Sequence, residues 1–121
     1  MTRSRLFVYG TLKQGFRSHH LLEGAEYLGP YQTGPGHFLL DCGDYPGLIR
    51  LAGHKRVQGE LYSVASSNFV RLDEHEGVPT LYTRELIDLE GVQGPAEAYF
   101  YQGPMEGKTL VKDGIWLGKG I

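Results

Sequence analysis

The sequence has little of what several common classes of protein need. Its 121 residues include one cysteine, Cys42, which cannot close an intrachain disulfide or build a thiolate zinc site by itself. No apolar run approaches the roughly 20 residues of a membrane-spanning helix. The first apolar run stops at Gly10 and is too short for the apolar core of a signal peptide. We therefore expect a cytoplasmic protein with no membrane association.

An excess of charge of one sign is also lacking. Twelve basic and 14 acidic residues give a net charge of −2, with no long basic run, so the signature of a nucleic-acid-binding protein is missing. The five histidines form no metal-binding pair. Residues 103–109 have three residues between their glycines, where a phosphate-binding loop needs four. We expect no nucleic-acid partner, no metal and no organic cofactor, and the oligomeric state is left open.

Glycine is abundant instead, with 18 residues scattered along the chain beside eight tyrosines, a composition that favours short strands joined by tight turns. The apolar patterns predict a short helix near residues 18–22 and a second helix that begins at Ser66 or Ser67 as N-cap and ends at Gly77. They predict strands at residues 6–9, 25–28, 37–41, 48–51, 57–64, 81–89 and 95–102. We therefore predict one α+β domain over residues 1–121, with a mostly antiparallel or mixed sheet curled into a barrel and one or two short helices.

One acidic residue falls on an apolar helix face. On a helical wheel, Glu76 shares the side of Phe69 and Leu72, in the last turn of the predicted helix. Burial and the helix dipole both raise the pKa of a carboxyl group placed there, which makes it a candidate general base. The alternative is structural, with Glu76 paired to Arg84 or capping a loop. Asp73 lies on the same face, and we expect it to hold a neighbouring loop by hydrogen bonds.

The segment from Tyr9 to Leu12 is a candidate binding loop. A buried strand that ends at Gly10 and Thr11 leaves backbone N–H groups without ladder partners. Such groups can bind a carboxylate or a developing oxyanion. The alternative is an ordinary exit from a strand. For Tyr82 we predict a pocket contact through its hydroxyl, with a tyrosine packed on the core of the sheet as the alternative.

Taken together, these segments resemble a known family. The run Phe7-Val8-Tyr9-Gly10-Thr11-Leu12-Lys13-Gln14-Gly15 looks like the opening motif of the γ-glutamylcyclotransferase-like superfamily, and Leu72-Asp73-x-x-Glu76-Gly77 is similar to its catalytic-glutamate segment. Tyr45-Pro46-Gly47, the segment 57–62 and Ala98-Tyr99-x-Tyr101 fit the same pattern. The resemblance spans about residues 5–117 and is nearest to the γ-glutamylamine cyclotransferase branch and its small bacterial relatives.

The resemblance implies a distorted β-barrel and a specific reaction. The backbone of Tyr9, Gly10, Thr11 and Leu12 would cradle a γ-glutamyl group, and Glu76 would be the acid/base. The substrate would be a γ-glutamyl amine or peptide whose own α-amine attacks its γ-carbonyl, giving 5-oxoproline and a free amine. Two alternatives stay open: a non-enzymatic binding or interaction module on the same fold, and γ-glutamyl deprotection of a biosynthetic intermediate.

Overall fold

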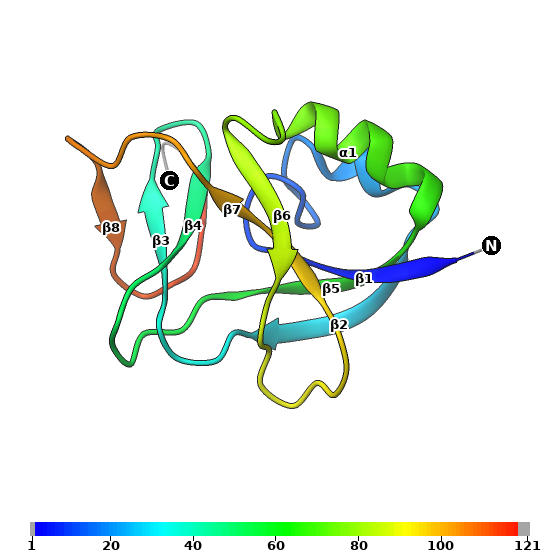
Figure 1. The fold of residues 1–121 in the computed structure, drawn as a ribbon, viewed down its shortest axis with the longest axis horizontal. Coiled ribbons are helices and arrows are strands. Elements are labelled where there is room, and N and C mark those ends of the chain that lie inside the picture. The colour runs from blue at the N-terminus through cyan, green and yellow to red at the C-terminus, as the bar shows by residue number, and fades with distance from the viewer. Residues whose placement is uncertain (1, 119–121) are drawn as a thin grey trace.

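A computed structural model describes residues 2–118. Within them the chain forms eight strands, one α-helix and two short 3-10 helices (Figure 1). In chain order the elements are β1 Arg3–Val8, η1 His19–Leu22, β2 Glu26–Gln32, β3 His37–Asp41, β4 Pro46–Arg50, β5 Gln58–Ala65, η2 Ser66–Asn68, α1 Phe69–His75, β6 Tyr82–Leu86, β7 Glu97–Tyr101 and β8 Thr109–Val111.

All eight strands belong to one mixed sheet. Their order is β2-β5-β1-β7-β4-β3-β8, and β6 pairs with β7 outside this path. The β1–β7 and β4–β7 ladders are parallel, and the other ladders are antiparallel. The predicted α+β class and mixed sheet are therefore confirmed. Closure of the sheet into a barrel stays a prediction, because no ladder within residues 2–118 joins β2 to β8.

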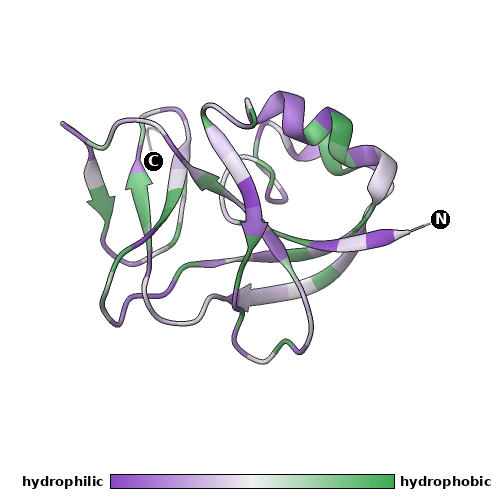
Figure 2. Ribbon diagram, in the orientation of Figure 1, coloured by the Kyte–Doolittle hydropathy of each residue, from purple (hydrophilic) through white to green (hydrophobic). Residues whose placement is uncertain are grey.

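Strand β1 is buried on both faces, which explains its continuous apolar run. Figure 2 shows it changing from hydrophilic residues at its start to hydrophobic ones at its end. Leu6 and Val8 join a core cluster that includes the α1 side chains Phe69 and Leu72. Phe7 packs into a second cluster on the other side of the strand. A strand covered on both faces is expected to be apolar throughout rather than alternating.

Helix α1 starts later than the sequence predicts and ends where predicted. Its N-cap is Asn68, without a side-chain capping bond, so the assignment of Ser66 or Ser67 as N-cap is wrong. The Ser66 hydroxyl instead bonds to Thr2, beside the start of β1. Gly77 has a φ of 68°, a conformation that favours glycine, and this turns the chain out of the helix as expected.

Several strands differ from the prediction: β6 ends at Leu86 rather than Leu89, β4 begins at Pro46 rather than Leu48, and β2 and β8 differ more. Strand β2 continues through Gly29 and Pro30, where the sequence suggests an end, with a register shift between Tyr27 and Gly29. It can include a proline because it is an edge strand, where the missing N–H leaves no ladder partner unsatisfied. Strand β8 is absent from the prediction because its three residues have no detectable periodicity, and its pairing with β3 defines it.

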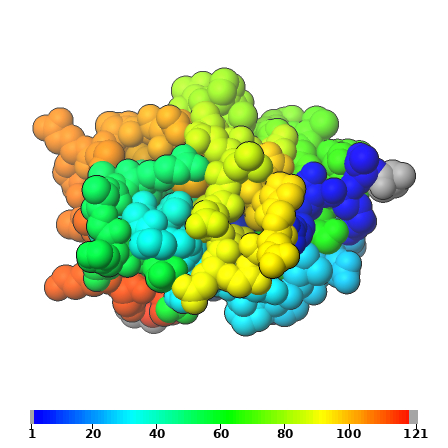
Figure 3. Space-filling model, turned by 60° about the horizontal axis from the view of Figure 1, so that its bottom comes forward, coloured from blue at the N-terminus to red at the C-terminus, as the bar shows by residue number. Residues whose placement is uncertain are grey.

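The connection from β6 to β7, residues 87–96, is anchored to the rest of the protein at several places, including the bond from the Glu90 amide to Gln32 of β2. The backbone of Asp88 accepts a hydrogen bond from Gly34, and the Arg5 guanidinium donates to the carbonyls of Gln93 and Pro95. Figure 3 shows this connection, in yellow, lying across one face of the molecule beside the blue N-terminal strand. These contacts help to fix the β6–β7 hairpin, whose strand β7 lies between β1 and β4.

Candidate active site

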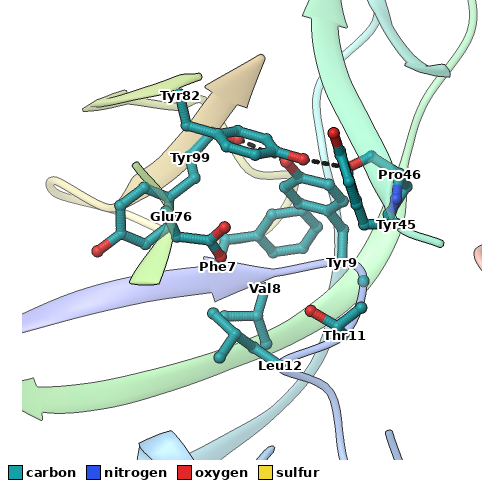
Figure 4. A pocket seen from close by; sticks show the side chains of 11 residues that line it. Phe7, Val8, Tyr9, Thr11, Leu12, Tyr45, Pro46, Glu76, Tyr82 and Tyr99 are labelled. Carbon is teal, nitrogen blue, oxygen red and sulfur yellow. Dashed lines mark hydrogen bonds between the residues drawn. The ribbon is translucent and has the colours of Figure 1, made fainter. Parts of the chain in front are cut away.

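A pocket lies where the end of β1, the start of β4, the end of α1 and the β6–β7 hairpin meet (Figure 4). It has about 330 Å³ of empty space, including the part open to solvent at its mouth. Its walls are mainly aromatic and aliphatic, with one carboxylate. The lining residues are Phe7, Val8, Tyr9, Gly10, Thr11, Leu12, Tyr45, Pro46, Glu76, Tyr82 and Tyr99. The structure therefore brings together all six residues that the sequence singled out for a site.

The loop after β1 lines this pocket and has unpaired backbone amides. The carbonyls of Gly10, Thr11 and Leu12 accept hydrogen bonds from Lys13 N, Ser18 N and His19 Nδ1 at 3.0, 3.0 and 2.8 Å. The amides of the same three residues donate none of the hydrogen bonds found within residues 2–118. The loop therefore turns its acceptors into the protein and leaves its donors for a ligand, the arrangement that suits an anion or an oxyanion.

Pro46 leaves no room for a side chain at position 10. A Cβ atom there would lie 2.5 Å from Cγ and 2.7 Å from Cδ of Pro46, far inside van der Waals contact. The missing side chain lets the loop approach the start of β4, and the two segments together form one wall of the pocket.

Glu76 forms the opposite side of the pocket, directly after α1. Its backbone stays in the helical region, with φ −82° and ψ −4°, and its N–H donates to Leu72 O at 3.0 Å. The side chain therefore keeps the inward direction that the helical wheel predicts, and its carboxylate points into the pocket in Figure 4. Burial raises the pKa of Glu76 from 4.5 to about 7.

The Glu76 carboxylate has no hydrogen-bond or ion-pair partner in residues 2–118, so the predicted alternative of a pair with Arg84 is wrong. Arg84 instead binds Asp73 through Nε and Nη2 at 2.9 and 3.1 Å, and Glu97 at 3.0 Å. Its guanidinium also lies 4.2 Å from the ring centroid of Phe69. Arg84, the cation that the sequence offered as a partner for Glu76, therefore binds Asp73 and Glu97 instead.

Asp73 joins α1 to the hairpin that carries two of the pocket tyrosines. Besides Arg84 on β6, it accepts a hydrogen bond of 2.7 Å from the hydroxyl of Tyr99 on β7. The expectation that Asp73 is a hydrogen-bonding anchor is confirmed, although it holds two strands rather than a loop. Because Asp73 lies three residues before Glu76, this contact fixes the end of α1 relative to the pocket wall.

Like Tyr99, the pocket tyrosines Tyr9 and Tyr82 use their hydroxyls inside the protein. Tyr9 donates to the carbonyl of Tyr99 at 2.6 Å and accepts from the Leu48 amide at 3.3 Å. Tyr82 donates to the carbonyl of Pro46 at 2.7 Å. Burial raises the pKa of both hydroxyls well above the usual value, so they stay neutral. The Tyr82 hydroxyl can still accept a hydrogen bond while it donates to Pro46, so its contact with a ligand stays a prediction.

Sequence reasoning left several lining residues unassigned, namely Phe7, Val8, Tyr45, Pro46 and Tyr99. Tyr45 and Pro46 carried a turn signal and Tyr99 a strand pattern, but neither signal shows which face points to a pocket. Only the pairing of β4 and β7 with each other, and of β7 with β1, places them there.

Within residues 2–118 there is no group of three or more His, Cys, Asp or Glu side chains that could hold a metal ion. No helix in that part of the chain is long and apolar enough to cross a membrane.

Comparisons with known proteins show which family the chain resembles over most of its length. Residues 6–118 match the family described as "Gamma-glutamyl cyclotransferase, AIG2-like". A Vibrio cholerae protein, provisionally named a γ-glutamylcyclotransferase, is 40% identical over 111 residues, which cover 92% of this chain and 93% of its own. The γ-glutamylaminecyclotransferase of Bos taurus is 41% identical over 106 residues, covering 79% of this chain and 63% of its own.

A solved structure extends the likeness to the fold. The solution structure of ytfP from Escherichia coli has a TM-score of 0.72 and 35% identity, and the match covers 93% of this chain and 96% of that one. The resemblance seen in the sequence is thereby confirmed: the chain belongs to the AIG2-like γ-glutamyl cyclotransferase family.

Proposed function

We propose that this protein cyclises a γ-glutamyl amine or peptide, releasing 5-oxoproline and the free amine. The observation that carries the proposal is the Glu76 carboxylate, half-buried and unpaired within residues 2–118, in one pocket with the unpaired amides of residues 10–12. A base and a set of oxyanion donors are the two groups that this cyclisation needs from a protein.

The nucleophile belongs to the substrate. Its α-nitrogen attacks its γ-carbonyl carbon, a five-membered ring closes, and the bond from that carbon to the leaving nitrogen breaks. The attacking nitrogen loses one proton and the leaving nitrogen gains one, so no water or cofactor is consumed. The protein has to hold the substrate in a folded conformation, which is an orientation effect worth several kcal/mol. Glu76 would transfer the proton between the two nitrogens.

The raised pKa of Glu76 suits this transfer. An α-amino group has a pKa near 8, so a carboxyl group at 4.5 would be mismatched by about 3.5 units, or roughly 5 kcal/mol. With the Glu76 pKa at about 7, the mismatch falls to about one unit, or roughly 1.4 kcal/mol. Burial on an apolar face thus brings the base close to the group that it must deprotonate.

The test is formation of 5-oxoproline from a panel of γ-glutamyl amines and peptides. Glu76→Gln should lower turnover roughly 10²–10⁴-fold, and Glu74→Gln, an exposed carboxylate on the same helix, is the matched control. Activity of Glu76→Gln within threefold of wild type would remove the proposed base. Binding of the panel without any 5-oxoproline from the wild type would favour a binding module instead.

A further inference from the structure

A second groove lies on the other face of the β6–β7 hairpin from the candidate active site. The ladder continues past the strand ends, with Ile87 N bonded to Ala96 O at 2.9 Å. Because side chains alternate between the faces of a strand, Ile87 and Ala96 point away from the face of Tyr82 and Tyr99. In Figure 3 the yellow connection lies beside cyan residues of β3. This hairpin groove is lined by the polar residues His37, Arg50 and Asp88 and by the apolar residues Leu86, Ile87 and Pro95.

His37 brings one available nitrogen to the hairpin groove. The residue is only 7% exposed, and its Nδ1 lies 2.9 Å from the carbonyl oxygen of Gly34. A carbonyl oxygen only accepts, so Nδ1 carries the proton and Nε2 of the neutral ring has a lone pair. Nε2 has no hydrogen-bond partner within residues 2–118, and no side-chain N or O atom there is both buried and unpartnered. Nε2 is therefore open to solvent, which His37 meets at the groove.

The Asp88 carboxylate lies beside the same backbone unit. The Gly34 amide donates to the Asp88 carbonyl at 2.9 Å, and a Cβ atom at position 34 would lie 2.7 Å from Asp88 Oδ2. The missing side chain of Gly34 lets the carboxylate approach the segment that also holds His37. The Asp88 carboxylate makes no hydrogen bond or ion pair within residues 2–118. One groove thus contains an available acceptor and an unpaired negative charge.

The positive charge in the hairpin groove is already balanced. Arg50 pairs with Glu85 at 2.8 Å and donates to the Leu86 carbonyl at 2.7 Å, and its guanidinium lies 3.7 Å from the ring centroid of Phe100. Asp88 therefore decides the charge that the groove favours. The Leu86 side chain is 65% exposed and provides an apolar wall. The empty space is about 720 Å³ with the part open to solvent, which is enough for a small molecule.

We propose that the hairpin groove binds a small organic ammonium ion that carries a short apolar chain. A primary ammonium group has a positive charge and three N–H donors, so it can donate to His37 Nε2 and pair with Asp88 together. Its chain then covers Leu86 and Ile87. The charge of Asp88 repels a carboxylate, and an alcohol has a donor but no charge. The inference does not depend on the proposed function, because the hairpin groove and the candidate active site share no lining residue.

Three compounds with the same four-carbon chain test this selection. The probe is n-butylammonium, and 1-butanol and butyrate are its neutral and anionic counterparts. In an NMR titration of ¹⁵N-labelled protein, butylammonium should shift the backbone amides of Ile87 and Asp88 saturably and leave those of Tyr82 and Tyr99 unchanged. Its affinity should be roughly tenfold higher than that of 1-butanol, from a hydrogen bond to a charged group. Butyrate should not bind, and added salt should weaken the binding of butylammonium.

Two variants locate the binding groups. Asp88→Asn changes an exposed residue and should lower the affinity for butylammonium roughly threefold. His37→Asn keeps an N–H for the Gly34 carbonyl but removes the Nε2 acceptor, and it should lower the affinity roughly tenfold. If His37→Asn does not fold, Asp88→Asn still decides. Asp113→Asn is the control, because this exposed residue accepts from the Ile115 amide and the asparagine oxygen can do the same; its affinity should equal that of the wild type.

Three results would overturn the proposal. The first is equal affinity for butylammonium and 1-butanol, which would leave only an apolar surface. The second is an affinity for butylammonium that is unchanged in Asp88→Asn. The third is the absence of saturable shifts at Ile87 and Asp88. None of these measurements uses 5-oxoproline formation, so the proposed function stands or fails separately.

Discussion

Replacing Glu76 with glutamine should make the protein more stable at alkaline pH, although it removes the proposed base. Burial raises the pKa of Glu76 from 4.5 to about 7. The folded state then holds the Glu76 proton more tightly than the unfolded state does. The contribution of this proton to stability is fully present below about pH 4.5 and is lost as pH rises to about 7. Above that range the folded protein contains a half-buried carboxylate with no counter-charge.

The size of the effect follows from the two pKa values. A difference of about 2.5 pKa units corresponds to roughly 3.4 kcal/mol, and partial solvent access reduces this to about 2–3 kcal/mol. Glutamine does not titrate, so Glu76→Gln should be more stable than wild type by about 2–3 kcal/mol at pH 8. That is roughly 10 °C in the unfolding midpoint for a domain of this size. Near pH 4 the advantage should vanish.

Urea unfolding of both proteins at pH 4, 5.5, 7 and 8, followed by the fluorescence of the buried Trp116, measures this difference. The same protein samples give 5-oxoproline formation, which should rise with pH through about 7 in the wild type and be low throughout in the variant. The control Glu74→Gln, which changes an exposed carboxylate on the same helix, should form 5-oxoproline at close to the wild-type rate. A Glu76→Gln protein that is less stable than wild type at pH 8 would refute the reasoning, because it would mean that the carboxylate makes a stabilising contact.

Three further substitutions test the packing around the pocket. Tyr9→Phe should cost about 1 kcal/mol of unfolding free energy, because it removes a buried hydroxyl that bonds to a carbonyl on β7 and an amide on β4; urea unfolding measures this, and a variant as stable as wild type contradicts it. Arg84→Met should cost about 1–3 kcal/mol and lower kcat, because Asp73 loses its bidentate partner and the end of α1 loosens; unchanged kcat in folded protein would separate this contact from catalysis. Gly10→Ala should raise KM at least tenfold, because a Cβ atom meets Pro46 at 2.5 Å; unchanged KM would show that the loop can shift without affecting the pocket.

Several features were available from the sequence because they depend on neighbouring residues. The apolar run of β1 stops at Gly10, and Gly77 ends α1 with a positive φ. The wheel placed Glu76 beside Phe69 and Leu72, since side-chain direction on a helix follows from residue spacing. The family resemblance used the same short segments, and the comparisons confirm it. Each of these signals is contained within about ten residues.

Only the tertiary structure decided which distant groups meet. The sequence offered Arg84 as a partner for Glu76, but the pairing of β6 with β7 brings Arg84 to Asp73 and Glu97 and leaves the Glu76 carboxylate unpaired within residues 2–118. Strand β8 exists because β3 provides its ladder. Such contacts join residues that are 11 or more positions apart, so they depend on strand order and register, which local periodicity does not encode.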